Sequence, residues 1–116
     1  MKTAEKQVHG AYANGCLTVT LSGEVDHHGA RAVREEIDRL LYQHRPRSFC
    51  LSLGGVNFMD SSGLGLILGR LAICRECGCP MRLTEASERM RRIFAMAGLA
   101  RMEGLEIEGL TKKECV

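Results

Sequence analysis

The sequence has no long uninterrupted apolar segment. Its N-terminus, MKTAEKQVHG, lacks the apolar stretch that a secretory signal peptide carries. The most apolar window, residues 64–73, is about half as long as a membrane span and is interrupted by Gly65, Gly69 and Arg70. We therefore expect a cytoplasmic protein that does not act at a membrane.

The net charge and the proline content are also low, and the cysteine content is below that of a disulfide scaffold. The formal net charge of +2 gives no electrostatic reason to expect a nucleic acid as partner. Six cysteines in 116 residues are fewer than a disulfide scaffold carries, so we expect free thiols in a reducing compartment. With two prolines, no repeat and no linker, residues 1–116 are expected to form a single domain, monomeric when free.

Apolar residues recur with a period of two in some segments and at helical spacing in others. Asn14-Gly15, a strong turn signal, is expected to join the first two strands into a hairpin. Helical connections make the later strands parallel, which predicts an α/β fold with a mixed, mostly parallel sheet, an N-terminal hairpin and helices covering the sheet. The expected strands are residues 6–13, 16–22, 48–53, 81–84 and 105–107, and the expected helices are residues 30–44, 62–77 and 90–97, followed by a brief C-terminal helix.

Three polar residues, Asp60, Ser61 and Ser62, lie where an expected strand meets an expected helix. Aspartate and serine are common there because a side-chain oxygen can accept a hydrogen bond from a free N–H group of the first helical turn. A serine at a helix N-terminus is also a good site for a phosphate, because the positive end of the helix stabilises a dianion. The tripeptide therefore predicts either a helix cap alone or a cap combined with a phosphorylation site.

The start of the following helix is apolar on all sides. Gly65 and Gly69 lie one turn apart on one face, and each costs about 1 kcal/mol relative to alanine. Their spacing predicts a close approach of another backbone, with tight packing of the helix on the sheet. The first turn, which includes Gly63 and Leu64, is a candidate surface for binding a partner protein.

Two stretches together resemble a known family. MDSSGLGLILGR (residues 59–70) and GEVDHH (residues 23–28) are similar to the STAS domains of bacterial anti-sigma factor antagonists, above all to the sporulation branch. FAMAGL (residues 94–99) resembles the end of the family's third helix. The resemblance covers about residues 8–110, and it implies the STAS fold and a binding protein that is not an enzyme and needs no cofactor.

The resemblance also implies partners and a regulatory cycle. The unphosphorylated protein would bind an anti-sigma factor that is also a serine kinase, and this would free a sporulation sigma factor. The kinase would then phosphorylate the first serine of the Asp-Ser-Ser run, which is Ser61, and the complex would dissociate. A serine phosphatase in the membrane would reverse the modification.

Other residues of the two motifs acquire expected roles in the same way. Asp60 is expected to serve kinase recognition or the geometry of the helix end, and Ser62 to help cap the helix. Asp26 and His27, in the loop before the first helix, are expected to flank the same surface. Glu24 belongs to the same motif, either as a partner contact or as a solvated charge.

Two alternative interpretations concern catalysis and nucleotide binding. A serine hydrolase could combine Ser61 with Asp26 and with His27 or His28, but neighbouring residues do not form a triad and the chain has no G-x-S-x-G turn. A nucleotide site could use the glycines that follow Ser62, but their spacing matches neither of the common phosphate-binding loops.

Two further alternatives remain open. Cys74, Cys77 and Cys79 have a spacing that could bind zinc near a helix end, if Cys50 or a histidine supplied a fourth ligand. Cysteine also serves as a small core residue, which is the competing interpretation. Finally, the same fold could serve a stress-response pathway with a different kinase acting on Ser61.

Overall fold

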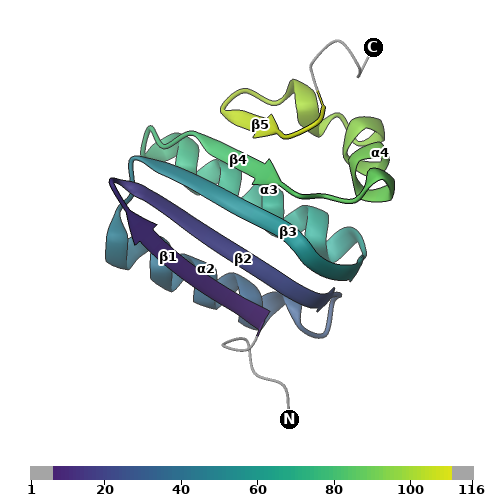
Figure 1. Ribbon diagram of the computed structural model, residues 1–116, viewed down its shortest axis with the longest axis horizontal. Helices are drawn as coiled ribbons and strands as arrows, with labels where there is room; N and C mark the ends of the chain where they lie inside the picture. The colour runs from purple at the N-terminus through teal and green to yellow at the C-terminus, as the bar shows by residue number, and fades with distance from the viewer. Residues whose placement is uncertain (1–6, 111–116) are drawn as a thin grey trace.

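The computed structural model describes residues 7–110 and contains a five-stranded sheet. The strands lie side by side in chain order (Figure 1): β1 (Val8–Ala13), β2 (Cys16–Val25), β3 (Ser48–Met59), β4 (Met81–Thr84) and β5 (Leu105–Ile107). β1 and β2 are antiparallel, whereas the pairs β2–β3, β3–β4 and β4–β5 are parallel. The predicted α/β fold with a mixed, mostly parallel sheet is therefore confirmed.

Helices connect the parallel strands. They are α2 (Ala30–His44), α3 (Ser61–Glu76) and α4 (Glu88–Met96), and a 3₁₀ turn, η1 (Leu99–Arg101), precedes β5. α2 and α3 both lie behind the sheet in Figure 1, so they cover the same face, while α4 lies beyond the end of β4. Within residues 7–110, no helix is both long enough and apolar enough to span a membrane.

The hairpin between β1 and β2 forms where the turn signal predicts it. Asn14 and Gly15 have φ angles of +53° and +82°, as a two-residue turn with both central residues in the left-handed region requires. Ala13 pairs with Cys16 across this turn. The predicted first strand begins at residue 6, which lies outside the described residues.

The core lies between the sheet and the helices α2 and α3. Alternate residues of β2 and β3 point into it, and the remaining side chains of these strands are mostly small and polar. This one-sided burial gives each strand the period of two seen in the sequence. The largest fully buried side chains are those of Leu17, Leu21, Ile37, Phe49, Leu51, Leu53, Ile67, Leu71, Met81, Leu83, Phe94 and Leu99.

β2 and β3 are longer than the sequence predicts. They were expected to end at residues 22 and 53, but they extend to Val25 and Met59. Gly54-Gly55, expected to end the third strand, lies inside β3, where two register shifts allow pairing with β2 to continue. Because β3 continues to Met59, Asp60 follows the strand directly and precedes the first residue of α3.

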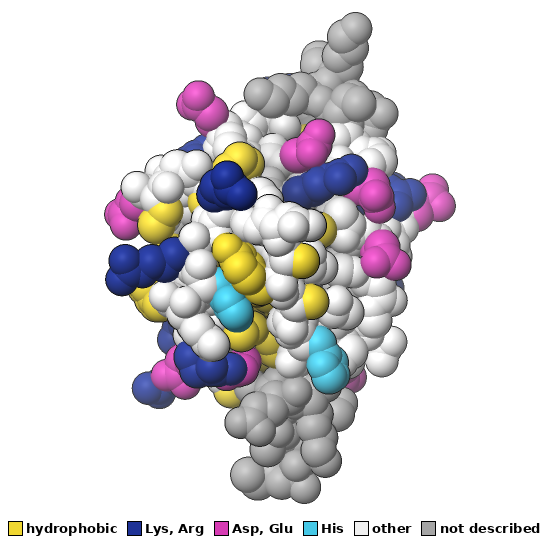
Figure 2. All heavy atoms as spheres, turned by 60° about the vertical axis from the view of Figure 1, so that its left-hand side comes forward, with side chains coloured by type: hydrophobic (Ala, Val, Ile, Leu, Met, Phe, Trp, Pro, Cys, Tyr) yellow, Lys and Arg dark blue, Asp and Glu magenta, His cyan; other side chains and the backbone are white. Residues whose placement is uncertain are grey.

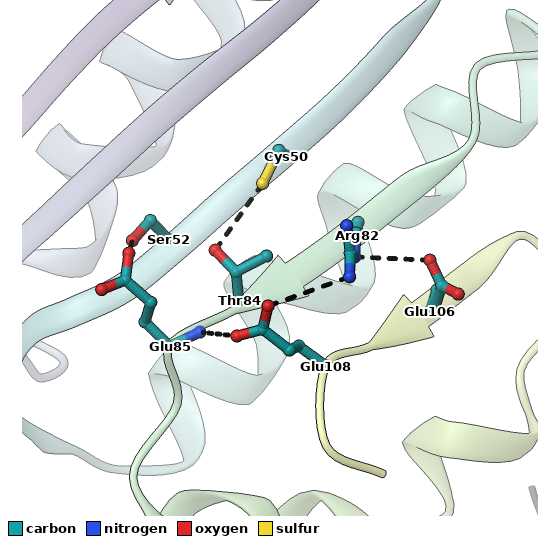
Figure 3. A network of polar contacts seen from close by, with 7 residues as sticks. All are labelled: Cys50, Ser52, Arg82, Thr84, Glu85, Glu106 and Glu108. Atoms are coloured by element: carbon teal, nitrogen blue, oxygen red, sulfur yellow. Dashed lines mark hydrogen bonds and ion pairs between the residues drawn. The ribbon is translucent and has the colours of Figure 1, made fainter. Parts of the chain in front are cut away.

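The face of the sheet away from α2 and α3 carries a polar network (Figure 3). Ser52 Oγ donates a hydrogen bond to Glu85 at 2.8 Å, and the Glu85 N–H group donates to Glu108 at 3.1 Å. Arg82 pairs with Glu106 at 3.4 Å and with Glu108 at 3.8 Å. These contacts tie β3, β4 and β5 together; the Ser52 side chain is buried, whereas Arg82, Glu106 and Glu108 remain in contact with water.

The edge strand β1 packs against the end of α2. The rings of Tyr12 and His44 stack with centroids 4.7 Å apart, so His44 takes part in this packing. Figure 2, which brings the left-hand side of Figure 1 forward, shows charged side chains mainly around the periphery and apolar and histidine side chains near the centre.

Glycines end two of the helices as expected. Gly78, after α3, has a φ of +67°, and Gly98, after α4, has a φ of +78°, which are conformations that favour glycine at a helix C-terminus. α3 starts and ends one residue earlier than predicted. The brief C-terminal helix expected from the sequence lies outside the described residues.

Candidate functional site

The tripeptide Asp60-Ser61-Ser62 forms the start of α3. Asp60 has an extended backbone, and its Oδ1 accepts a hydrogen bond from the Ser62 N–H group at 2.8 Å. Asp60 is therefore the cap of the helix, as one of its two expected roles required. Ser62 was expected to help with capping, which is wrong: its hydroxyl lies in the first turn, and its backbone N–H group is the donor that is capped.

Ser61 is the first residue of α3, and its side chain is exposed. Within residues 7–110, no hydrogen bond of its hydroxyl is found, so the cap does not depend on it. The residues of the first turn of α3 are not acidic, but the capping carboxylate of Asp60 lies at the same end of the helix and offsets part of its positive charge. The N–H groups of Ser62, Gly63 and Leu64 donate to Asp60, so an anion attached to Ser61 would lie at the N-terminal end of the helix beside the Asp60 carboxylate.

Gly63 is required for packing, unlike the next two glycines of α3. A Cβ atom on Gly63 would overlap with Cγ and Sδ of Met59, whereas one on Gly65 or Gly69 would meet open space. The predicted close approach of a backbone at Gly65 and Gly69 is therefore wrong. A side chain at either position would instead extend into open space beside α3.

The loop after β2 lies beside the start of α3. β2 and β3 run parallel, with Val25 paired with Met59, and the Asp60 N–H group donates to the Val25 carbonyl at 3.3 Å. Asp26 follows at once, and its Oδ1 accepts hydrogen bonds from the N–H groups of His28 and Gly29, both at 3.1 Å. The structure thus places the 23–28 motif and the Asp-Ser-Ser motif at one edge of the sheet.

Glu24, near the end of β2, and the two histidines of that loop have exposed side chains. The Glu24 carbonyl accepts a hydrogen bond from Gln7 Nε2 at 2.9 Å, so the backbone is held in place while the carboxylate remains in water. The rings of His27 and His28 lie against each other with centroids 4.1 Å apart. The end of β2 and the loop that follows therefore carry two acidic side chains and an imidazole pair beside the start of α3.

A groove with a volume of about 250 Å³ opens between the start of α3 and α4. We call it the Ser61 groove; it is lined by Met59, Asp60, Ser61, Leu64, Met90, Ile93 and Phe94. Apart from Asp60 and Ser61, its lining is apolar, and Ile93 is 38% exposed. Met96, one turn further along α4, is 89% exposed. Exposed apolar side chains gathered around a groove are typical of surfaces that bind other proteins.

A buried ion pair holds α3 against α2. Arg70 Nε lies 2.8 Å from Asp38 Oδ1, and the Arg70 side chain is buried between the helices. Burial raises the pKa of Asp38 above its ordinary value of 3.8, although the charge of Arg70 opposes this. Burial likewise lowers the pKa of Arg70. Asp38 belongs to a run of charged residues in α2, with Arg34, Glu35 and Arg39, and this pattern predicts a solvated outer face; for Asp38 that prediction is wrong, because its side chain is 26% exposed and paired with Arg70.

The residues of the alternative interpretations are not arranged for those functions. Within residues 7–110, no hydrogen bond joins Ser61 to His27 or His28, and the Asp26 carboxylate is bound to backbone N–H groups. Gly65 and Gly69 lie inside α3 and not in a loop before it, so their backbone is not free to surround a phosphate. In the described part of the chain, no group of three possible metal ligands forms at Cys74, Cys77 and Cys79.

Comparison with known proteins identifies relatives over nearly the whole chain. A family model described as "Mlab, STAS domain" matches residues 10–108. The chain is 35% identical over 113 residues to an anti-sigma F factor antagonist of Paenibacillus polymyxa, a match that covers 95% of this chain and 97% of the relative. It is 34% identical over 83 residues to an anti-sigma-B factor antagonist of Bacillus subtilis (strain 168), covering 72% of this chain and 74% of that one.

Solved structures give the same result. The anti-sigma factor antagonist SpoIIAA in its unphosphorylated form matches with a TM-score of 0.68 at 26% identity, over 92% of each chain. The phosphorylated form of SpoIIAA from Bacillus matches with a TM-score of 0.64 at 28% identity, over 92% of this chain and 94% of that one. The predicted STAS fold is therefore confirmed, and the chain belongs to the STAS-domain family and, within it, to the anti-sigma factor antagonists.

Proposed function

We propose that this protein is an anti-sigma factor antagonist controlled by phosphorylation of Ser61. The unphosphorylated chain binds an anti-sigma factor that is also a serine kinase, and the sigma factor held by that kinase is released. The kinase then transfers the γ-phosphoryl group of ATP to Ser61 Oγ, ADP leaves, and the phosphorylated chain dissociates. A serine phosphatase restores the active form by hydrolysing the phosphate ester, and the whole cycle takes place with this protein in the cytoplasm.

The position of Ser61 carries this proposal. Its hydroxyl is exposed at the rim of the Ser61 groove, while Asp60 performs the capping. A phosphoryl group can therefore be added without removing a hydrogen bond from the fold. Because the kinase supplies Mg²⁺ and the catalytic base, Ser61 needs no activating partner in its own chain.

The surface around Ser61 supports a large contact with the partner. Glu24 at the end of β2, and Asp26 and His27 in the loop that follows, come from the strand paired with the residues before Ser61, and the Ser61 groove with Leu64 includes Ser61 itself. We infer that apolar side chains of the kinase fill the groove while polar groups contact the loop. Asp60, Ser62 and Gly63 contribute by fixing the shape of the first turn of α3.

A phosphate on Ser61 would weaken such a complex directly. It adds about −1.5 to −2 units of charge at pH 7 to a surface that already carries Asp26 and Asp60. Charge repulsion and the cost of desolvating the phosphate oppose binding, and a loss of about 3 to 4 kcal/mol lowers affinity by about 10² to 10³-fold. The positive end of α3 stabilises the same phosphate, so the switch does not require the helix to unfold.

Two pathways are candidates for this cycle, sporulation and the stress response. The match to the anti-sigma F factor antagonist extends over more of the chain than the match to the anti-sigma-B factor antagonist, at nearly equal identity. This difference supports a partner of the sporulation type. A higher rate of Ser61 phosphorylation by a stress-type kinase than by a sporulation-type kinase would reverse the assignment.

The proposal is tested by release of the sigma factor. The unphosphorylated chain is titrated into a complex of a sporulation anti-sigma kinase with its labelled sigma factor, and free sigma factor is measured by fluorescence anisotropy. We expect release by the parent chain and by Ser61→Ala, and a loss of about 10²-fold in potency for Ser61→Glu. Equal potency of Ser61→Glu and the matched control Ser62→Glu would contradict the assignment of Ser61.

A further inference from the structure

Three thiols gather at the C-terminal end of α3, opposite to Ser61. Cys74 is 1% exposed and Cys79 is 6% exposed, whereas the side chain of Cys77 is exposed to solvent. The proposed function uses none of them, and they do not form a metal-binding group within residues 7–110. The chemistry of this cluster therefore rests on the thiols themselves.

The way α3 ends brings Cys74 and Cys79 together. The Cys79 N–H group donates to the Cys74 carbonyl at 2.8 Å, and the Gly78 N–H group donates to the Arg75 carbonyl at 3.2 Å. This pair of bonds, with Gly78 at positive φ, is the Schellman arrangement, in which the side chain after the glycine packs against the last inward-facing turn of the helix. The thiols of Cys74 and Cys79 therefore lie close enough to affect each other's pKa, and the Cys79 thiol donates a hydrogen bond to the Pro80 carbonyl at 3.7 Å.

Two cavities give access to the cluster. A cavity of about 340 Å³ between the ends of α2 and α3 is lined by all three cysteines together with Tyr42 and Ile73. A cavity of about 380 Å³ is lined by Cys74 and Cys79 and by residues after the helix, including Pro80. A small molecule that enters the first cavity therefore meets the exposed thiol of Cys77 next to the buried pair.

We propose that this cluster is a thiol–disulfide exchange site for a low-molecular-weight disulfide, with Cys77 as the entry thiol and a Cys74–Cys79 disulfide as the product. The Cys77 thiolate attacks one sulfur of the reagent, which forms a mixed disulfide and releases the first small thiol. The Cys79 thiolate then attacks Cys77 Sγ and releases the second small thiol. The Cys74 thiolate finally attacks Cys79 Sγ, which returns Cys77 as a free thiol.

The exchange is balanced without any other reactant. Two protein thiols, Cys74 and Cys79, lose their protons and are oxidised to one disulfide. One reagent disulfide is reduced to two small thiols, which take up those two protons. The new bond closes a loop from Cys74 to Cys79 across a helix end that already holds these residues in contact.

Burial explains why the exposed thiol reacts first. Burial raises the pKa of Cys74 to about 12, and it also raises the pKa of Cys79. At pH 7 the thiolate fraction of Cys74 is therefore about 10³-fold smaller than that of an ordinary thiol. The greater nucleophilicity of its thiolate offsets only part of this difference. Once Cys77 carries the mixed disulfide, attack by Cys79 is intramolecular, and proximity offsets its low thiolate fraction.

The test is a disulfide map of the full chain. It is made with the variant Cys115→Ser, which removes a sixth thiol that lies outside the described residues and could form other disulfides. The protein is incubated with glutathione disulfide, free thiols are alkylated, and the products are analysed by intact-mass and peptide mass spectrometry. We expect the mass to fall by two hydrogen atoms, with Cys74 linked to Cys79 and Cys77 free for alkylation. A glutathione that remains on Cys77 as the end product would overturn the inference, as would no reaction or a disulfide through Cys16 or Cys50.

Two variants test the order of the steps. Cys77→Ser is expected to slow formation of the disulfide at least about tenfold, because only buried thiols remain to attack the reagent. Cys79→Ala is expected to stop the reaction with one glutathione on Cys77. The matched control Cys50→Ser, on the polar face of the sheet, is expected to leave the rate unchanged. An unchanged rate in Cys77→Ser would show that Cys77 is not the entry thiol and would overturn the inference.

Discussion

At the residue scale, Asp60 and Ser61 divide two roles between neighbouring side chains. The Asp60 carboxylate accepts the hydrogen bond that caps α3, and the Ser61 hydroxyl remains exposed. A phosphate can therefore be added and removed at Ser61 while the helix end keeps its cap. This separation makes stability and switching independent properties that can be altered one at a time.

Replacement of Asp60 tests this division. Asp60→Ala is expected to lower the free energy of unfolding by about 1 kcal/mol through loss of the cap, whereas Asp60→Asn retains an oxygen that can accept the bond. Ser61→Ala, the matched control, is expected to change stability by less than about 0.5 kcal/mol. Urea denaturation followed by circular dichroism measures all three. Equal losses in Asp60→Ala and Ser61→Ala would mean that both side chains hold the helix end.

The glycines of α3 give a second contrast. Gly65→Ala is expected to raise the free energy of unfolding by up to about 1 kcal/mol, because the added methyl group meets open space and alanine favours the helix. Gly63→Ala is expected to lower it by about 1 to 3 kcal/mol, because its methyl group would displace Met59. Thermal unfolding of both variants checks this. Stabilisation by Gly63→Ala would contradict the packing described for Met59.

The sequence predicts the location of the candidate site better than its details. Asp60 and Ser61 are placed correctly at the start of a helix because polar residues between two apolar runs mark such a position. Ser62 was assigned a capping role because serine and aspartate are both good caps, and only the backbone conformation decides between them. The Ser61 groove was missed because its walls come from α3 and α4, which are about 30 residues apart in the sequence.

At the scale of elements, the contact between α2 and α3 determines where Ser61 is held. Arg70 and Asp38 join the two helices through a buried ion pair. Sequence reasoning missed this pair, because Asp38 follows the charged pattern of a solvated face. An arginine within the apolar part of the helix, with apolar residues on both sides, is the signal that could have found it, since a buried arginine needs an acidic partner on a neighbouring element.

The contribution of the Arg70–Asp38 ion pair to the free energy of unfolding can be measured with a double-mutant cycle. Arg70→Met alone is expected to lower the free energy of unfolding by about 2 to 4 kcal/mol, because it leaves the Asp38 carboxylate partly buried and unpaired. The double variant Arg70→Met, Asp38→Leu is expected to recover most of that loss, because apolar side chains pay no desolvation cost. Chemical denaturation of the four proteins gives the coupling energy. Additive losses would show that the two side chains do not interact.

The strands illustrate why element boundaries are hard to predict. Gly54-Gly55 is a strong signal for a break, yet β3 continues through it because β2 continues beside it and the register shifts absorb the irregularity. Such pairing depends on a neighbour far away in sequence. The period of two, which depends only on local burial, correctly predicts the central parts of β2 and β3.

At the scale of the whole molecule, the fold is expected to be the same in both states of the switch. The sheet and α2 hold α3 in place through a continuous core, and the exposed Ser61 lies at its margin. The related SpoIIAA matches this chain over 92% of its length in both its unphosphorylated and its phosphorylated form. The proposed switch therefore acts through the charge and shape of one surface.

Nuclear magnetic resonance tests this expectation. Phosphorylation of Ser61 is expected to shift the amide signals of the first turn of α3, the loop at residues 24–28 and the lining of the Ser61 groove. Signals of β1, β4 and the C-terminal end of α3 are expected to remain unchanged. Large shifts in those distant elements would show that the phosphate acts through a conformational change.

The central claim is that Ser61, and no other serine, is the phosphoacceptor, and peptide mass spectrometry tests it most directly. The parent chain, Ser61→Ala and the matched control Ser62→Ala are incubated with ATP, Mg²⁺ and a sporulation anti-sigma kinase, and the phosphopeptides are mapped. We predict one phosphate on Ser61 in the parent chain and in Ser62→Ala, and none in Ser61→Ala. Phosphate on Ser62, or undiminished transfer to Ser61→Ala, would contradict the account and leave Asp60-Ser61-Ser62 as a helix cap alone.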